Sequence, residues 1–119
     1  MELGPNQKKW IEALRSGEYS QAEGYLRTEG GYCCLGVAVK VISGREPKIR
    51  GTGQLIGVYS SVRKALKLRG SNGELVSYTG TGDWTRADNL AKLNDDGWTF
   101  DQIADYIEAN PEDVFIESA

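Results

Sequence analysis

The stretch Leu90-Ala-Lys-Leu-Asn-Asp-Asp-Gly-Trp-Thr-Phe-Asp-Gln-Ile-Ala-Asp-Tyr-Ile-Glu108 carries the clearest structural signal of the chain. Its second half opens with a capping box, in which the Thr99 hydroxyl accepts a backbone N–H and the Gln102 side chain accepts one in return. Apolar residues then recur at helical spacing. A preceding helix over residues 85–94 ends at an Asn-Asp-Asp-Gly turn. We therefore predict a C-terminal αα-hairpin.

Two further helices are predicted on the N-terminal side of this hairpin. Asn6 can cap a helix that runs to about Ser16, with one apolar side and one charged side. Ser60 or Ser61 can cap a helix that runs to about Leu68. Together with the hairpin, the helical spacing of apolar residues predicts a core that contains Trp10, Leu14, Leu35, Val41, Leu66, Leu90, Ile103 and Ile107.

Residues 32–42 form the most apolar run, Tyr-Cys-Cys-Leu-Gly-Val-Ala-Val-Lys-Val-Ile. A run of this length fits a helix or a strand. Apolar residues at i, i+1, i+4, i+7 and i+8 from Cys34 line one helical face, whereas the valines and Gly36 favour a strand. We predict a buried helix, on which Gly36 would let another backbone approach closely.

The remaining segments indicate turns and short strands. Glu29-Gly-Gly31 is a turn, and the glycine-rich residues 44–57 form a loop or a poorly regular hairpin. Gln54 to Tyr59 and Glu74 to Thr79 are predicted as short strands. The chain is thus expected to be a single domain over residues 1–119. Its class is mainly α (α+β), with four to five helices, a small β-hairpin element and the C-terminal αα-hairpin.

Charge is distributed unevenly in a chain whose net charge is −3. Residues 45–69 carry a net charge of +6, with Glu46 as their single acid, and residues 86–119 carry −7. Most charge runs are solvated faces, but a basic patch can also bind an anionic partner, and its glycines let a backbone approach a phosphate. The candidate anion- or partner-binding residues are Arg45, Lys48, Arg50, Tyr59 (for stacking), Arg63, Lys64, Lys67 and Arg69.

The chain contains no histidine, which excludes Ser-His-Asp triads, Cys-His dyads and His-ligated metals. The adjacent Cys33 and Cys34 cannot form a disulfide framework or, alone, a four-thiolate metal site. A thiol at a helix N-terminus can be a nucleophile, but it has no histidine base here, and free cysteine is usually buried. We expect packed thiols, no catalytic residue and no cofactor.

Three ligand motifs do not match the sequence. Residues 51–57 lack the spacing and the Lys-Ser/Thr ending of a P-loop. The polar cluster over residues 94–101 lacks EF-hand spacing and is better explained by helix capping and turns, so we expect no metal site. The last helix carries three acids and no Lys or Arg between Thr99 and Asn110, and phosphates would repel it as a DNA-recognition helix.

The sequence shows no pattern typical of a membrane-spanning segment or a secretory signal peptide. No stretch approaches the ~18 apolar residues of a membrane span. The first nine residues have no apolar core of the kind found in signal peptides. We therefore expect the cytosol of the cell that makes or hosts the protein, and no membrane partner.

Three motifs are spread in order over nearly the whole chain: Gln7-Lys-Lys-Trp-Ile-Glu-Ala-Leu-Arg-Ser-Gly-Glu-Tyr19, Tyr32-Cys-Cys-Leu-Gly-Val37, and the quoted Leu90–Glu108 stretch. Together they resemble a family of small uncharacterised proteins found mostly in bacteriophages and prophages. The resemblance implies a phage-type accessory protein. It carries no activity and no functional residues with it.

The leading hypothesis is a non-catalytic binding module that acts on a host or phage macromolecule through its basic middle or its acidic end, a counter-defence inhibitor being one version. Its partner would be a protein, or the acidic end of a second copy. One alternative is nucleic-acid or nucleotide binding by residues 45–69. A third hypothesis is an enzyme that uses Cys33 or Cys34.

Overall fold

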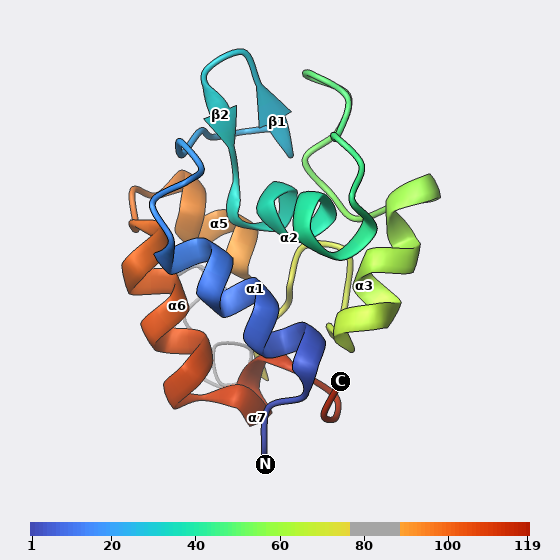
Figure 1. Cartoon of the computed structure of the whole chain (residues 1–119), viewed down its shortest axis with the longest axis vertical. Helices are drawn as coiled ribbons and strands as arrows, with labels where there is room; N and C mark the ends of the chain where they lie inside the picture. The colour runs from blue at the N-terminus through green and yellow to red at the C-terminus, as the bar shows by residue number, and fades with distance from the viewer. Residues whose placement is uncertain (77–88) are drawn as a thin grey trace.

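The computed structural model describes residues 1–76 and 89–119 (Figure 1). The described residues are mainly helical with one small antiparallel hairpin, which confirms the predicted class. The elements are α1 (Pro5–Arg15), β1 (Arg27–Thr28), β2 (Gly31–Tyr32), α2 (Cys34–Ser43), the 3-10 turn η1 (Gly57–Tyr59), α3 (Ser60–Leu66), α5 (Leu90–Asp95), α6 (Phe100–Ala109) and α7 (Pro111–Val114). The described part holds six α-helices, more than the four to five predicted, because Pro111 begins the short α7.

The helix α1 begins at Pro5, so the prediction that Asn6 caps it was wrong. A residue in the first turn of a helix leaves its backbone N–H unpaired within the helix. Proline has no N–H to leave unpaired, so it is favoured at the first helical position. Gly4 is the cap residue, and its N–H donates to Gln7 Oε1 at 2.9 Å. The buried Gln7 also donates to the carbonyls of Leu66 and Glu117 at 3.0 and 2.8 Å. One glutamine therefore joins both ends of the chain to α3, and the two termini lie near each other (Figure 1).

Residues 34–43 form the helix α2, as predicted, and every residue from 33 to 39 is buried. The close approach expected at Gly36 is confirmed. A Cβ at Gly36 would lie 2.7 Å from the Leu26 carbonyl carbon and closer still to its oxygen. The absence of a side chain thus lets the segment before β1 cross directly over the first turn of α2.

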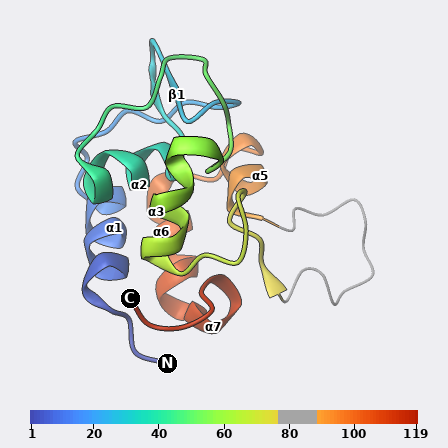
Figure 2. The same ribbon diagram turned by 90° about the vertical axis from the view of Figure 1, so that its right-hand side faces the viewer.

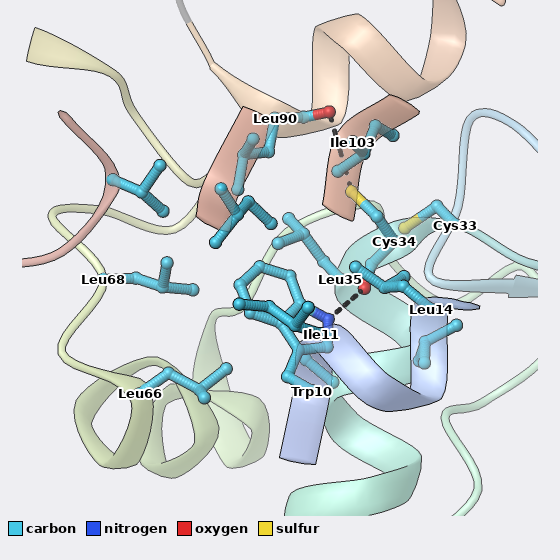
Figure 3. Close-up of a cluster of buried hydrophobic side chains, with 14 of the residues drawn as sticks. Trp10, Ile11, Leu14, Cys33, Cys34, Leu35, Leu66, Leu68, Leu90 and Ile103 are labelled. Carbon is cyan, nitrogen blue, oxygen red and sulfur yellow. Dashed lines mark hydrogen bonds between the residues drawn. The ribbon is translucent and has the colours of Figure 1, made fainter. Parts of the chain in front are cut away.

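The core lies where α1, α2 and α6 meet (Figure 1). Trp10 is fully buried, meets the Phe115 ring edge-on with ring centroids 6.2 Å apart, and donates its indole N–H to the Cys34 carbonyl at 2.9 Å (Figure 3). The predicted core residues are buried with one exception. Val41 is only partly buried, because it lies at the edge of α2 in an open pocket lined also by Lys9 and Glu12 of α1.

The hairpin lies at residues 27–32, around the predicted glycine turn, and not where strands were predicted. Residues 54–59 form no strand. Their last part coils into η1, and α3 follows directly from Ser60 with no side-chain cap. Of the predicted strand at 74–79, Glu74 makes one isolated bridge with Asn89, and residues 77–79 lie outside the described residues. Strands of two residues are too short for an alternating pattern to reveal them.

The C-terminal αα-hairpin is confirmed for α5 and α6. The described part of the first helix begins at Leu90, where Asn89 caps it by accepting from Lys92 N at 2.8 Å; residues 85–88 lie outside the described residues. The Thr99–Gln102 capping box forms as predicted at the start of α6. None of the helices in the described ranges is long and apolar enough to cross a membrane.

Candidate binding surface

The basic segment begins as a loop that is fastened to the rest of the molecule. It leaves the C-terminal end of α2, arches beside the hairpin and returns to α3 (Figure 2). The N–H of Arg50 donates to the Arg27 carbonyl at 2.9 Å, and the N–H of Leu26 donates to the Thr52 carbonyl at 2.7 Å. These backbone bonds hold the loop in one place, so its side chains form a defined surface.

Glu46, the single acid of the basic segment, turns back onto the hairpin and α2. Its carboxylate lies 2.9 Å from Lys40 Nζ and 3.4 Å from Arg27 Nε, and it accepts a hydrogen bond from the Tyr32 hydroxyl. The Tyr32 hydrogen bond, followed by that of Lys40, holds the pKa of Glu46 below its usual value. Burial, followed by the Glu46 bond, raises the pKa of Tyr32. The neighbouring Arg45 is left exposed, with its positive charge facing solvent.

A pocket of about 260 Å³ lies between the end of α2 and the η1–α3 segment. Its walls combine three valines, three hydroxyl residues and one cation: Val39, Val58, Val62, Ser43, Tyr59, Ser61 and Arg45. The Tyr59 hydroxyl accepts the N–H of Lys48 at 2.9 Å, which joins the loop to the pocket wall. The structure thus brings together Arg45, Lys48 and Tyr59 from the predicted set.

The seven cations of the predicted set divide into two groups. Three of them have intramolecular partners. Arg50 pairs with Glu29 at 3.2 Å, Lys67 pairs with Glu117 at 3.5 Å, and Arg69 donates to the carbonyls of Glu112 and Phe115. Within residues 1–76 and 89–119, by contrast, no carboxylate forms an ion pair with Arg45, Lys48, Arg63 or Lys64.

Sequence reasoning missed three exposed apolar residues beside these cations. Ile49 is 40%, Ile56 47% and Val58 77% exposed. These apolar residues lie in a glycine-rich segment and show neither helical nor strand spacing. Apolar residues without such spacing have no common face to bury, and this is the sequence signal that could have identified them as exposed. We give the name basic–apolar face to the unpaired cations and exposed apolar residues of segment 45–64, together with Tyr59; Arg45, Val58 and Tyr59 share the pocket, and Lys48 bonds Tyr59. Its members are Arg45, Lys48, Ile49, Ile56, Val58, Tyr59, Arg63 and Lys64.

The two cysteines pack into the core. Cys33 is the cap residue of α2, and Cys34 Sγ lies 3.6 Å from the Leu90 carbonyl oxygen (Figure 3). Burial raises the pKa of Cys33 to about 11 and raises that of Cys34 well above its usual value. Because the thiolate is the nucleophilic form, this environment does not suit a cysteine nucleophile.

We expect both thiols to be nearly inert to iodoacetamide at neutral pH in the folded chain. A rise of the Cys33 pKa from 9.0 to about 11 lowers the thiolate fraction, by about a hundredfold, and burial of the sulfur slows the reaction further. The control is the same chain unfolded in guanidinium, followed by mass spectrometry. Rapid modification of one cysteine in the folded chain would contradict this result and support the enzyme hypothesis.

The polar cluster at residues 94–101 serves the fold. Asn94 is fully buried; its Oδ1 accepts from Gln21 Nε2 at 2.8 Å and from Cys34 N at 3.2 Å, and its Nδ2 donates to the Ala22 carbonyl. Asn94 thus accepts a hydrogen bond from the Cys34 N–H, which lies in the first turn of α2 and has no acceptor within that helix. In the part of the chain that the structure describes, no three His, Cys, Asp or Glu residues are grouped as a metal would require.

Comparison with known proteins gives one partial match. The model of a family described as a domain of unknown function (DUF8296) matches residues 5–51. This match spans α1, the hairpin, α2 and the first part of the basic loop, and it ends before η1 and α3. No curated protein and no solved structure matches the chain significantly.

Proposed function

We propose that this chain is a non-catalytic binding module, a phage-type accessory protein that docks onto an acidic surface of a host or phage protein. The observation that carries the proposal is the composition of the basic–apolar face. The same segment carries four cations without a carboxylate partner in the described ranges and three exposed apolar side chains, of which Val58 is the most exposed. Such a mixture of apolar area and unpaired charge is typical of a surface that a partner covers.

The acidic end of the chain is the weaker candidate, because much of its charge is paired within the molecule. Arg15 forms hydrogen-bonded ion pairs with Asp105 at 2.7 Å and with Glu108 at 3.1 Å. Glu117 pairs with Lys67 at 3.5 Å, and Glu112 pairs with the chain's amino group at 3.0 Å. These contacts reduce the negative charge that α6 and the C-terminal segment offer to a partner, so the basic–apolar face is favoured.

The apolar residues also favour a protein partner over a nucleic acid. Protein surfaces that bind single-stranded nucleic acid combine cations with aromatic rings on which bases stack. Tyr59 is the aromatic residue of this face, but its ring is partly buried against the core and its hydroxyl accepts the Lys48 N–H. The exposed Ile49, Ile56 and Val58 cannot pair with phosphate or sugar groups, whereas they suit the apolar centre of a protein interface.

Nucleotide or nucleic-acid binding is the second candidate, and the unpaired cations are the observation that supports it. The pocket is small for this role, however. At about 260 Å³, it falls below the roughly 300–1,000 Å³ typical of small-molecule sites. A nucleic acid would therefore have to bind by surface charge alone, and its affinity would fall steeply with added salt.

The proposal predicts that reversing two cations of the face abolishes partner capture. The test uses immobilised full-length chain, lysate of the cell that expresses it, and mass spectrometry of protein and nucleic acid. Arg45→Glu with Lys64→Glu should lose a protein that the unaltered chain retains, because two attractive contacts become repulsive. The matched control, Lys8→Glu with Lys92→Glu, makes the same change of net charge at two exposed lysines of α1 and α5 and should retain it.

Equal retention by both variants would contradict the proposal. So would recovery of nucleic acid in place of protein, with capture that disappears steeply as salt rises. Circular dichroism of both variants checks that the helices are intact. All four substituted side chains are exposed, and the one ion pair lost, between Lys92 and Asp96, is an exposed pair that contributes little, so the fold should tolerate the changes.

A further inference from the structure

The pocket between α2 and α3 has a chemistry that identifies one kind of occupant. We propose that it takes a branched apolar side chain of the partner, while a carboxylate next to that side chain binds Arg45 and Tyr59. The partner segment is thus an acidic peptide that carries a leucine-like residue beside an Asp or Glu. This inference rests on the proposed function and specifies what binds the centre of the basic–apolar face.

The lining of the pocket is part apolar and part polar: valines form one side, and three of its residues carry hydroxyls. Val39 and Val62 form buried walls and Val58 forms the exposed rim. The Ser43 hydroxyl donates to the Val39 carbonyl at 2.6 Å and accepts the Arg45 N–H at 3.2 Å, and the Ser61 hydroxyl donates to the Val58 carbonyl at 3.4 Å. Both serine hydroxyls are hydrogen-bonded within the chain, so an occupant need not pair them. Val58 offers most of the apolar surface, because Val39 and Val62 are each only 1% exposed.

Two hydrogen-bond donors on the polar side of the pocket indicate that the occupant carries an acceptor. The Arg45 side chain has no hydrogen bond or ion pair to any described residue. The Tyr59 oxygen accepts the Lys48 N–H, and its own proton has no acceptor within residues 1–76 and 89–119. Glu46, the adjacent acid, is turned away onto Lys40 and Arg27. A carboxylate accepts from both donors, whereas a cationic group would be repelled by Arg45.

The size of the pocket limits the occupant to one anchoring side chain. A volume of about 260 Å³ is smaller than the roughly 300 Å³ at which small-molecule sites begin. Interfaces commonly concentrate their affinity in such an anchor, which one pocket of the partner surface receives. The Val58 rim, exposed by 77% in the isolated chain, would be covered when the anchor enters.

The test uses three peptide probes and NMR of the full chain. The probes are acetyl-Leu-Glu-amide, acetyl-Leu-Gln-amide and acetyl-Gly-Glu-amide, titrated to tens of millimolar with inorganic phosphate as a fourth titrant. Acetyl-Leu-Glu-amide should give saturable shifts at the Val58 and Val62 methyls and at Arg45, and should bind about fivefold more tightly than either of the other peptides.

Two variants assign the shifts to the pocket. Val58→Asp places a charge at the rim and should remove the shifts, whereas Ile116→Asp alters another exposed apolar residue (60%) at the C-terminal end and should leave them. Arg45→Gln should remove the preference for Glu over Gln and keep the leucine-dependent shifts. Both exposed positions tolerate a polar side chain, so loss of the fold does not interfere.

Several results would overturn the inference: no saturable shift at the pocket, equal binding of the three peptides, shifts that Val58→Asp leaves unchanged, or phosphate binding as tightly as acetyl-Leu-Glu-amide. These results are independent of the capture experiment. Partner capture that depends on Arg45 and Lys64 without probe binding leaves the proposed function standing and refutes the inference. Probe binding without any captured protein supports the inference and refutes the proposed function.

Discussion

Replacing Gly36 with alanine is expected to destabilise the whole domain, lowering the free energy of unfolding by about 3 kcal/mol. The added Cβ would lie 2.7 Å from the Leu26 carbonyl carbon and closer to its oxygen, and the same oxygen accepts the Cys33 N–H at 3.2 Å. These obstacles are backbone atoms, which cannot move aside as the end of a flexible side chain can. Relief requires the segment before β1 to separate from α2, and this exposes the fully buried Leu26.

Urea denaturation followed by circular dichroism measures this effect. The matched control is Gly30→Ala in the hairpin turn, where a new Cβ would meet only Thr28 Oγ1 at an ordinary 3.6 Å. That variant should unfold within about 0.5 kcal/mol of the unaltered chain. Equal stability of the two variants would show that α2 and Leu26 do not pack as described.

Asn94→Leu is expected to lower the free energy of unfolding by about 3 kcal/mol, although the two side chains have the same number of heavy atoms and the same branching. The change removes the partner of Cys34 N, of the Ala22 carbonyl and of one Gln21 N–H at once. A buried polar group left unpaired costs about 1–3 kcal/mol, and Gln21 keeps its second bond to the Trp98 carbonyl. The loss should therefore exceed that of a single hydrogen bond.

The control for this prediction is Asn6→Leu, at an exposed position on the first turn of α1. Thermal unfolding should place it near the unaltered chain and place Asn94→Leu well below both. If the two asparagine variants unfold together, Asn94 does not join α2 to the α5–α6 turn in the way the structure indicates.

The parts of the fold that could be predicted are those whose causes lie close together in the sequence. The Thr99–Gln102 capping box and the helical face that starts at Cys34 are patterns within a few residues, and both formed as predicted. The role of Gly36 also followed from its position on a buried helix. Asn94 had no such signal, because its partner Gln21 is 73 positions away and its own neighbours are acidic turn residues.

The candidate surface was predictable in its region and not in its composition. The excess of cations at 45–69 indicated the right segment, but which cations stay unpaired depends on acids elsewhere in the chain. Lys67 meets Glu117 and Arg50 meets Glu29 only after folding. The exposure of Val58 was equally hidden, since a strand at 54–59 would have paired this stretch with a neighbour, whereas η1 leaves it on the surface.

Binding of an acidic protein through the unpaired cations of the basic–apolar face can be measured as a change in affinity. The most direct measurement is the affinity for the captured partner, determined by calorimetry for the unaltered chain and for the two charge-reversed pairs. We expect Arg45→Glu with Lys64→Glu to weaken binding by about a hundredfold, at roughly 1–1.5 kcal/mol for each reversed contact, and Lys8→Glu with Lys92→Glu to change it by less than about threefold. Equal affinities for the two pairs would contradict this expectation.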